Sequence, residues 1–183
     1  MNASKLQVST AQLQIAGVES WPTVELDEDL QQLKLVLNTV LAAGALPTLQ
    51  LTYTGQTTDT GKGCIRNTYS QAGETKYLAI GDLYDDGART VYPCFDNDSI
   101  QAPLELTIVV ERGYEATCSL GLLRRQNVAG NKESFEFQRS PVWPPSVLSF
   151  VLAQLSFIEA EDHGLRTMRY RIGALQGIPF SPI

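Results

Sequence analysis

Apolar and polar residues alternate along much of the chain, and a period of two is typical of β-strands with one buried face. In the stretch TLQLTYT (48–54), Leu49, Leu51 and Tyr53 fall on one face. The same alternation predicts further strands at residues 5–17, 75–84, 88–95, 133–138 and 165–173. Because neighbouring strands are joined by short turns, the pattern favours an antiparallel meander over alternating β-α-β units.

The strongest hairpin signal covers residues 104–122. Leucine, isoleucine and valine alternate with polar residues up to Val110, and the alternation resumes from Tyr114 after a turn at Arg112-Gly113. We therefore expect two strands paired with each other at the centre of the core, with Ile108 and Leu120 buried.

Two segments instead show helical spacing. After Asp27, a plausible N-cap, apolar residues recur at steps of three and four until Gly44 and Pro47. The apolar positions of this stripe are Leu30, Leu33, Val36, Leu37, Val40 and Leu41. The spacing over residues 147–158 predicts a second helix with a wide apolar face, although so short an apolar run is also compatible with a buried strand.

The predicted fold class is α+β. It consists mainly of an antiparallel β meander, either a sandwich or a partly closed barrel, with one or two covering helices. A length of 183 residues suits one core, and no repeat or long linker divides it, so we expect a single domain over residues 1–183. Residues 173–183 form an extended C-terminal strap in this prediction.

Composition limits the class of protein and its location in the cell. Apolar residues make up 43% of the chain and charged residues 19%, as in ordinary globular proteins. The longest apolar run, about a dozen residues, is too short for a membrane helix, and the N-terminus has no secretory signal. A net charge of −6 disfavours nucleic acid. The three widely spaced cysteines read as structural thiols, so we expect the cytoplasm or a particle assembled there.

The stretch GQTTDTGKG (55–63) resembles a phosphate-binding loop but departs from it. Five residues separate Gly55 from Gly61-Lys62, one too many, and Gly63 stands where a magnesium-binding hydroxyl is needed. The residues that follow have no helical stripe to hold an anion. We expect a flexible loop, no nucleotide and no cofactor.

DLYDDG (82–87) resembles the start of a calcium loop. Asp82, Asp86 and Gly87 match positions one, five and six, but Tyr84 and Pro93 occupy positions three and twelve, where oxygen ligands belong. The pattern favours a turn in a hairpin, and it leaves open a weak cation site at Asp82 and Asp86.

The single histidine, His163, lies in EAEDHGL near Glu161 and Asp162. A histidine-dependent hydrolase needs a nucleophile motif, which the sequence lacks, and a multi-histidine metal site needs a second histidine. We therefore interpret this segment as a polar turn without a catalytic role.

Five arginines could form a basic stripe that binds nucleic acid: Arg124, Arg125, Arg166, Arg169 and Arg171. The last two alternate with apolar residues, which indicates the solvated face of a strand. We expect Glu133 or Glu136 to pair with them across the sheet.

The failure of every catalytic pattern favours a protein without enzymatic activity, a structural or assembly subunit of a phage-like particle or homo-oligomer. Its partners would be other protein subunits or copies of itself. The uncharged end IGALQGIPFSPI is too apolar for a solvated tail. It supplies the predicted partner-binding residues, which are Leu175, Ile178, Phe180 and Ile183.

The alternative function is a small-molecule-binding β-barrel with modest enzymatic activity. Aromatic residues would line its cavity, namely Tyr53, Tyr77, Tyr92, Tyr114 and Trp143.

Overall fold

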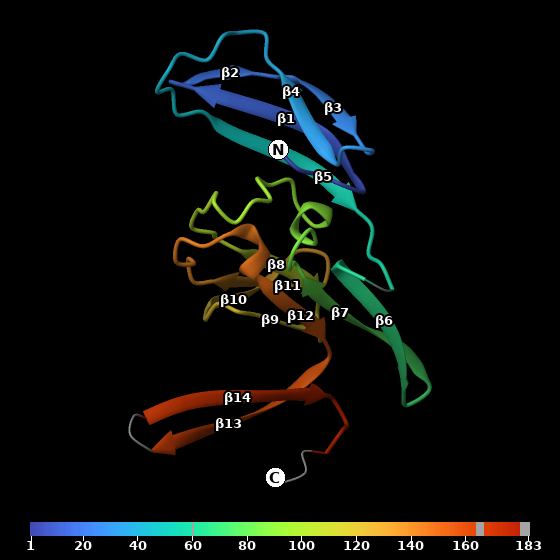
Figure 1. The fold of residues 1–183 in the computed structure, drawn as a ribbon. Helices are drawn as coiled ribbons and strands as arrows, with labels where there is room; N and C mark the ends of the chain where they lie inside the picture. The colour runs from blue at the N-terminus through green and yellow to red at the C-terminus, as the bar shows by residue number, and fades with distance from the viewer. Residues whose placement is uncertain (60, 164–166, 180–183) are drawn as a thin grey trace. The chain divides into compact units, whose positions relative to one another are not determined.

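The computed structural model of the chain describes residues 1–59, 61–163 and 167–179, without the side chains of Met168 and Arg169. Strands make up 56% of the chain, and the described residues contain two 3-10 turns but no α-helix. The strands, labelled in Figure 1, are β1 Leu6–Ile15, β2 Val18–Ser20, β3 Thr23–Asp27, β4 Gln32–Val36, β5 Thr48–Gly55, β6 Gly63–Gln71, β7 Glu74–Asp82, β8 Thr107–Glu111, β9 Glu115–Cys118, β10 Leu122–Val128, β11 Lys132–Phe137, β12 Ser149–Ala153, β13 Leu155–His163 and β14 Thr167–Leu175. The 3-10 turns are η1 Ala88–Thr90 and η2 Pro145–Val147.

The chain forms two compact units, each described here by itself. The first contains residues 1–65, 81–104 and 140–149, and the second contains residues 66–80, 105–139 and 150–183. The prediction of a single domain over residues 1–183 stays a prediction. No helix in the described part of the chain is long and apolar enough to cross a membrane.

The first unit contains the sheet β2-β1-β5 and the hairpin β3-β4, both antiparallel. Strand β1 turns into β2 at Ala16 and Gly17, where φ is +47° and +81°. Alternate residues of β1 and β4 point into a small core, in which Leu6 and Leu33 are fully buried. This core fixes the sheet that carries the N-terminal strand.

The second unit is sandwich-like. Antiparallel sheet β10-β11-β8 and sheet β6-β7-β12-β9 contribute side chains to one apolar cluster built around Val110, Tyr114 and Phe135. The rings of Tyr77 and Tyr114 stack with centroids 4.2 Å apart. Antiparallel β13-β14 forms a separate two-stranded sheet. None of these sheets is closed, so the mainly antiparallel β fold is confirmed in its sandwich form.

The helix predicted after Asp27 is wrong, because this segment belongs to the β3-β4 hairpin. Val24 lies opposite Leu35 in that hairpin, and Leu26 lies opposite Leu33. The Asp27 carboxylate accepts a hydrogen bond from the Leu30 amide at 2.9 Å, so it caps the hairpin turn rather than a helix. The rest of the predicted apolar helix face does not form either, since Val40, near its end, is 97% exposed.

The second predicted helix, residues 147–158, is also wrong, and the strand alternative holds. Its residues enter η2, β12 and β13, where β-branched and aromatic side chains favour extended backbone.

The predicted 104–122 hairpin has the right strands but the wrong pairing. Strand β8 pairs with β11, whereas β9 pairs with β12 in the other sheet. The chain turns after Glu111, whose carbonyl accepts the Tyr114 amide at 3.1 Å, and then crosses between the sheets. A period of two identifies the buried face of a strand but not its partner. Ile108 and Leu120 are half-buried around the cluster rather than at its centre.

Candidate functional site

Residues 83–106, between β7 and β8, form the longest segment of the described chain without a strand, and they carry the candidate site. Gly87 opens η1 at a point where the backbone folds back so tightly that a Cβ would overlap the carbonyl oxygen of Asp82. The Thr90 hydroxyl donates to the Gly87 carbonyl at 2.8 Å. The predicted strand at 88–95 is therefore wrong, because this close turn and Pro93 prevent a regular ladder.

A buried ion pair anchors this segment. The Arg89 Nε lies 2.8 Å from Asp96 Oδ2, and the Asp96 side chain is only 3% exposed. Arg89 also donates to the Gln31 side chain at 3.0 Å, and the Asp96 amide donates to Asn2 Oδ1 at 3.2 Å. Backbone bonds join Asn2 and Cys94 in both directions. The network ties the loop to the N-terminus and to the β3-β4 turn.

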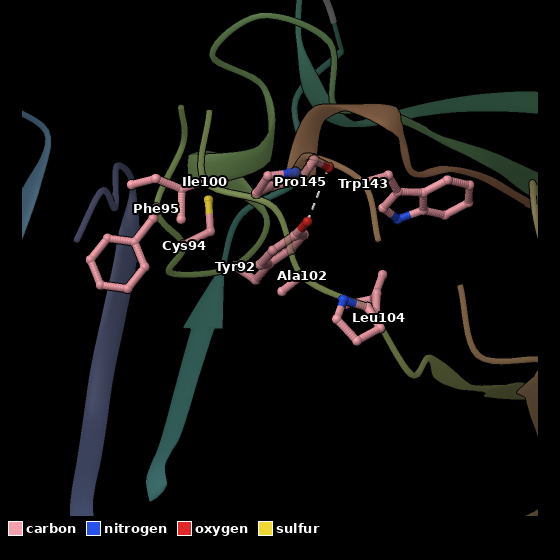
Figure 2. A pocket seen from close by; sticks show the side chains of 9 residues that line it. Tyr92, Cys94, Phe95, Ile100, Ala102, Leu104, Trp143 and Pro145 are labelled. Carbon is pink, nitrogen blue, oxygen red and sulfur yellow. Dashed lines mark hydrogen bonds between the residues drawn. The ribbon is translucent and has the colours of Figure 1, made fainter. Parts of the chain in front are cut away.

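The same loop lines an apolar pocket of roughly 180 Å³ together with residues 143 and 145 (Figure 2). The Tyr92 hydroxyl donates to the Pro145 carbonyl at 3.1 Å, which closes one wall. Antiparallel backbone bonds between Ala102 and Trp143 position another. The lining residues are Tyr92, Cys94, Phe95, Ile100, Ala102, Pro103, Leu104, Trp143 and Pro145. Ligand pockets usually exceed 300 Å³, so this one fits a single apolar side chain better than a whole ligand.

The two titratable groups in the pocket stay protonated at neutral pH. Burial raises the pKa of the Cys94 thiol to about 12, and the nearby Asp96 carboxylate contributes to that shift. Burial also raises the pKa of Tyr92. At neutral pH, neither group is therefore present as the anion that would act as a base or nucleophile.

Cys94 is therefore expected to resist thiol reagents in the folded protein. A pKa three units above the ordinary 9.0 leaves roughly a thousandfold less thiolate at pH 8. Mass spectrometry after labelling should find Cys94 modified only once guanidinium unfolds the chain. Because the pKa of Cys94 is raised in the folded state, the contribution of this thiol to the free energy of unfolding is fully present below pH 9. That contribution is lost as the pH rises toward 12. Rapid labelling of Cys94 under native conditions would contradict this assignment.

Of the two residues of the predicted cation position, Asp86 pairs with an amine instead, whereas Asp82 Oδ1 accepts a hydrogen bond from the Tyr84 amide at 3.3 Å. Lys62 Nζ lies 2.5 Å from Asp85 Oδ2 and 3.0 Å from Asp86 Oδ1. The hydrogen bond that Lys62 donates to Asp85 is the main reason that the pKa of Lys62 is raised, and Lys62 in turn lowers the pKa of Asp86. Among the described residues, no three His, Cys, Asp or Glu side chains gather closely enough to hold a metal ion.

The loop that resembles a phosphate-binding motif runs into a strand. Gly63 begins β6, so no helix N-terminus follows Lys62. The expectation that residues 55–63 do not bind a nucleotide stays a prediction.

His163 ends β13 rather than lying in a turn. Its Nε2 is 3.7 Å from the Glu161 carboxylate, and its side chain is 70% exposed. A strand-end histidine this exposed lacks the enclosed setting in which a catalytic base is oriented.

The arginines do not share one stripe. Arg125 lies 2.8 Å from both Glu115 and Glu133, and Arg124 lies 2.7 Å from Glu136. For Arg171, the expected pairing with Glu133 or Glu136 is therefore wrong, since β11 is the neighbour of β10. Arg171 instead pairs with Glu159 at 3.7 Å. Arg166 and the Arg169 side chain lie outside the described residues.

The aromatic residues proposed to line one cavity are dispersed. Tyr92 and Trp143 line the pocket, whereas Tyr77 and Tyr114 stack in the second unit and Tyr53 packs near Leu6 in the first.

The predicted partner-binding residues lie at the C-terminal end. Leu175 closes β14 opposite Leu155 and is half-buried, whereas Ile178 is 54% exposed. Phe180 and Ile183 lie outside the described residues. Their role in binding a partner stays a prediction.

Sequence reasoning missed the Arg89–Asp96 pair, and of the residues that line the pocket it named only Tyr92 and Trp143. The available signal was the presence of one arginine and one aspartate at the ends of the otherwise uncharged stretch TVYPCF. Charges that bracket so apolar a loop are usually paired when they are buried.

Comparison with known proteins places these observations in context. Residues 1–147 match the family described as Peptidase M1 N-terminal domain. Aminopeptidase M1 of Arabidopsis thaliana is 27% identical over 177 residues, which cover 94% of this chain and 20% of that protein. Aminopeptidase Q of Homo sapiens is 28% identical over 141 residues, covering 74% and 14%. Aminopeptidase 2 of Candida albicans is 22% identical over 162 residues, covering 87% and 17%. The chain thus spans a fifth or less of the length of these relatives.

These similarities correct the functional predictions. The structural or assembly subunit is wrong, because the matched family and the relatives are peptidases. The expectation that the protein has no enzymatic activity is wrong for the same reason. The alternative, a small-molecule-binding barrel, fails too, since the sheets are open and the match is to a peptidase domain.

Proposed function

The chain belongs to the family of Peptidase M1 N-terminal domains, and from this premise we propose that it acts as the N-terminal domain of an aminopeptidase. The observation that carries the proposal is the match over residues 1–147, which includes both the Arg89–Asp96 pair and the whole pocket. The proposed domain supports the cleavage of residues from peptide N-termini by an enzyme several times its length.

Within such an enzyme, this domain contributes binding surface and the remainder contributes bond cleavage. Peptide hydrolysis needs an activated nucleophile or a metal-activated water. His163 is exposed, and Cys94 and Tyr92 remain protonated at neutral pH. We therefore assign the bond-breaking groups to the part of the aminopeptidase beyond this chain. We also propose a cytoplasmic location, supported by the free thiols of Cys94 and Cys118.

A domain replacement tests the proposal. Arabidopsis aminopeptidase M1 is prepared without the segment aligned to this chain, and a chimera carries this chain in its place. Activity is measured as the release of p-nitroaniline from alanyl- and leucyl-p-nitroanilide. The chimera is expected to exceed the truncated enzyme at least tenfold, because a family member restores the missing domain. This chain alone is expected to release nothing above the buffer rate.

A second chimera that carries an unrelated β domain of similar length is the matched control, and it should match the truncated enzyme. The proposal is overturned if the first chimera is folded by circular dichroism yet no more active than this control.

A further inference from the structure

The apolar pocket of the first unit has a buried floor and an open mouth. Its lining comes from residues 92–104 and 143–145, all of which belong to that unit. Cys94 is 7% exposed and belongs to the floor, whereas Phe95 and Ile100 are 54% and 48% exposed and belong to the mouth. A small molecule therefore reaches the pocket from solvent without any opening of the fold.

The polar groups of the lining are bonded within the protein. The Tyr92 hydroxyl donates to the Pro145 carbonyl at 3.1 Å, and backbone bonds join Ala102 and Trp143 in both directions. The amide and carbonyl of Cys94 are also bonded, and its thiol stays neutral because burial raises its pKa. None of the lining residues carries a charge. A charged ligand would lose its hydration here without gaining a partner, whereas a neutral apolar ligand loses nothing.

The volume of the pocket sets the size of the ligand. An apolar protein cavity of about 150 Å³ stays dry and binds benzene. The present pocket, at roughly 180 Å³, has room for one six-membered ring with a small substituent. Pockets for larger ligands start at about 300 Å³, so a molecule of two or three rings does not fit.

The lining favours an aromatic ring over an aliphatic one. Figure 2 shows Tyr92 and Cys94 between the rings of Phe95 and Trp143. Aromatic rings attract one another in offset and edge-to-face contacts beyond the burial of their area. A polarisable sulfur beside a ring adds a further favourable contact. An aliphatic ligand of the same size gains dispersion alone.

We propose that this pocket is a binding site for one neutral aromatic ring. The ring belongs either to a free molecule such as toluene or to the side chain of a peptide, since both sources present the same chemistry. This inference goes beyond the proposed function and does not depend on it. Failure of the chimera to cleave a substrate leaves ring binding untouched, and failure of ring binding leaves the chimera untouched.

The test uses the full chain with Trp21→Phe, which leaves Trp143 as its one tryptophan. Trp21 is 65% exposed, so its replacement does not disturb the core. Toluene is titrated while Trp143 emission is followed, and a saturable change with a dissociation constant of about 1 mM or tighter is expected. Methylcyclohexane, which has the same shape without the aromatic ring, should bind at least threefold more weakly. Benzoate, which adds a charge, should bind at least tenfold more weakly.

A matched pair of variants locates the site. Ala102 and Ala43 are both exposed residues of the first unit, but only Ala102 lines the pocket. Ala102→Leu fills the mouth and should weaken toluene binding at least tenfold, whereas Ala43→Leu should change it less than twofold. In the chain without either leucine, nuclear Overhauser contacts between toluene and the Leu104 methyl groups are expected, and they locate the ring independently of any variant.

Competition distinguishes the two sources of the ring. N-acetylphenylalaninamide that displaces toluene assigns the site to a peptide side chain, and binding of toluene alone assigns it to a free molecule. The inference is overturned if the emission of Trp143 shows no saturable change, or if the two leucine variants bind toluene equally. Benzoate binding as tight as that of toluene, or binding without contacts to Leu104, would contradict it as well.

Discussion

Replacement of Phe135 by alanine is expected to lower the free energy of unfolding by about 3–5 kcal/mol. Phe135 is 1% exposed and belongs to β11, the central strand of its sheet. Its ring packs in the cluster of Val110 and Tyr114, and the Arg125 guanidinium lies 4.7 Å from its centroid. The substitution therefore removes buried apolar area, leaves a cavity and removes a cation–π contact. Urea denaturation followed by circular dichroism measures the change.

The matched control is Val109→Ala on the adjacent strand. Val109 lies opposite Ser134, one position from Phe135 along the ladder, but its side chain points outward and is 50% exposed. Its loss should change the free energy of unfolding by less than about 0.5 kcal/mol, as is usual for surface positions. Similar effects of the two substitutions would mean that β11 does not carry the core.

The sequence predicted most of the strands, and the reason is local. In strands such as β1 and β5, one face is more buried than the other, and that asymmetry appears as a period of two. Pairing is not local, which is why β8 and β9 were expected in one hairpin although they lie in different sheets. The leucines after Asp27 fit periods of two and of nearly four at once, and tertiary packing against Leu6 selected the strand.

The candidate site could not be predicted for a related physical reason. Arg89 reaches Gln31, 58 residues away in sequence, and Asp96 reaches Asn2, 94 residues away. No periodic pattern specifies contacts at such separations. The hypothesis of a structural subunit had a different weakness, because it treated missing catalytic motifs as a sign of missing catalysis. That reasoning fails for a chain that matches one domain of much longer enzymes.

Replacement of Arg89 by methionine is expected to destabilise the first unit by about 3–5 kcal/mol, the usual effect of breaking one side of a buried ion pair. Methionine keeps much of the apolar stem of arginine but donates no hydrogen bond. It would leave the Asp96 carboxylate, 3% exposed, without its cation, and Gln31 without a donor. The melting temperature and urea midpoint should both fall. The apolar pocket should loosen with them, since Tyr92 and Cys94 lie between the two paired residues.

Two variants separate lost charge pairing from lost packing. Arg124→Met breaks the exposed pair with Glu136, whose side chains are 61% and 36% exposed, and should cost no more than about 1 kcal/mol. The double variant Arg89→Met with Asp96→Asn should regain part of the lost stability, because a neutral amide needs no counter-charge when it is buried. If the double variant is instead as unstable as the sum of its single substitutions, the two residues act independently. The loop would then be held by the backbone bonds between Asn2 and Cys94 rather than by the ion pair.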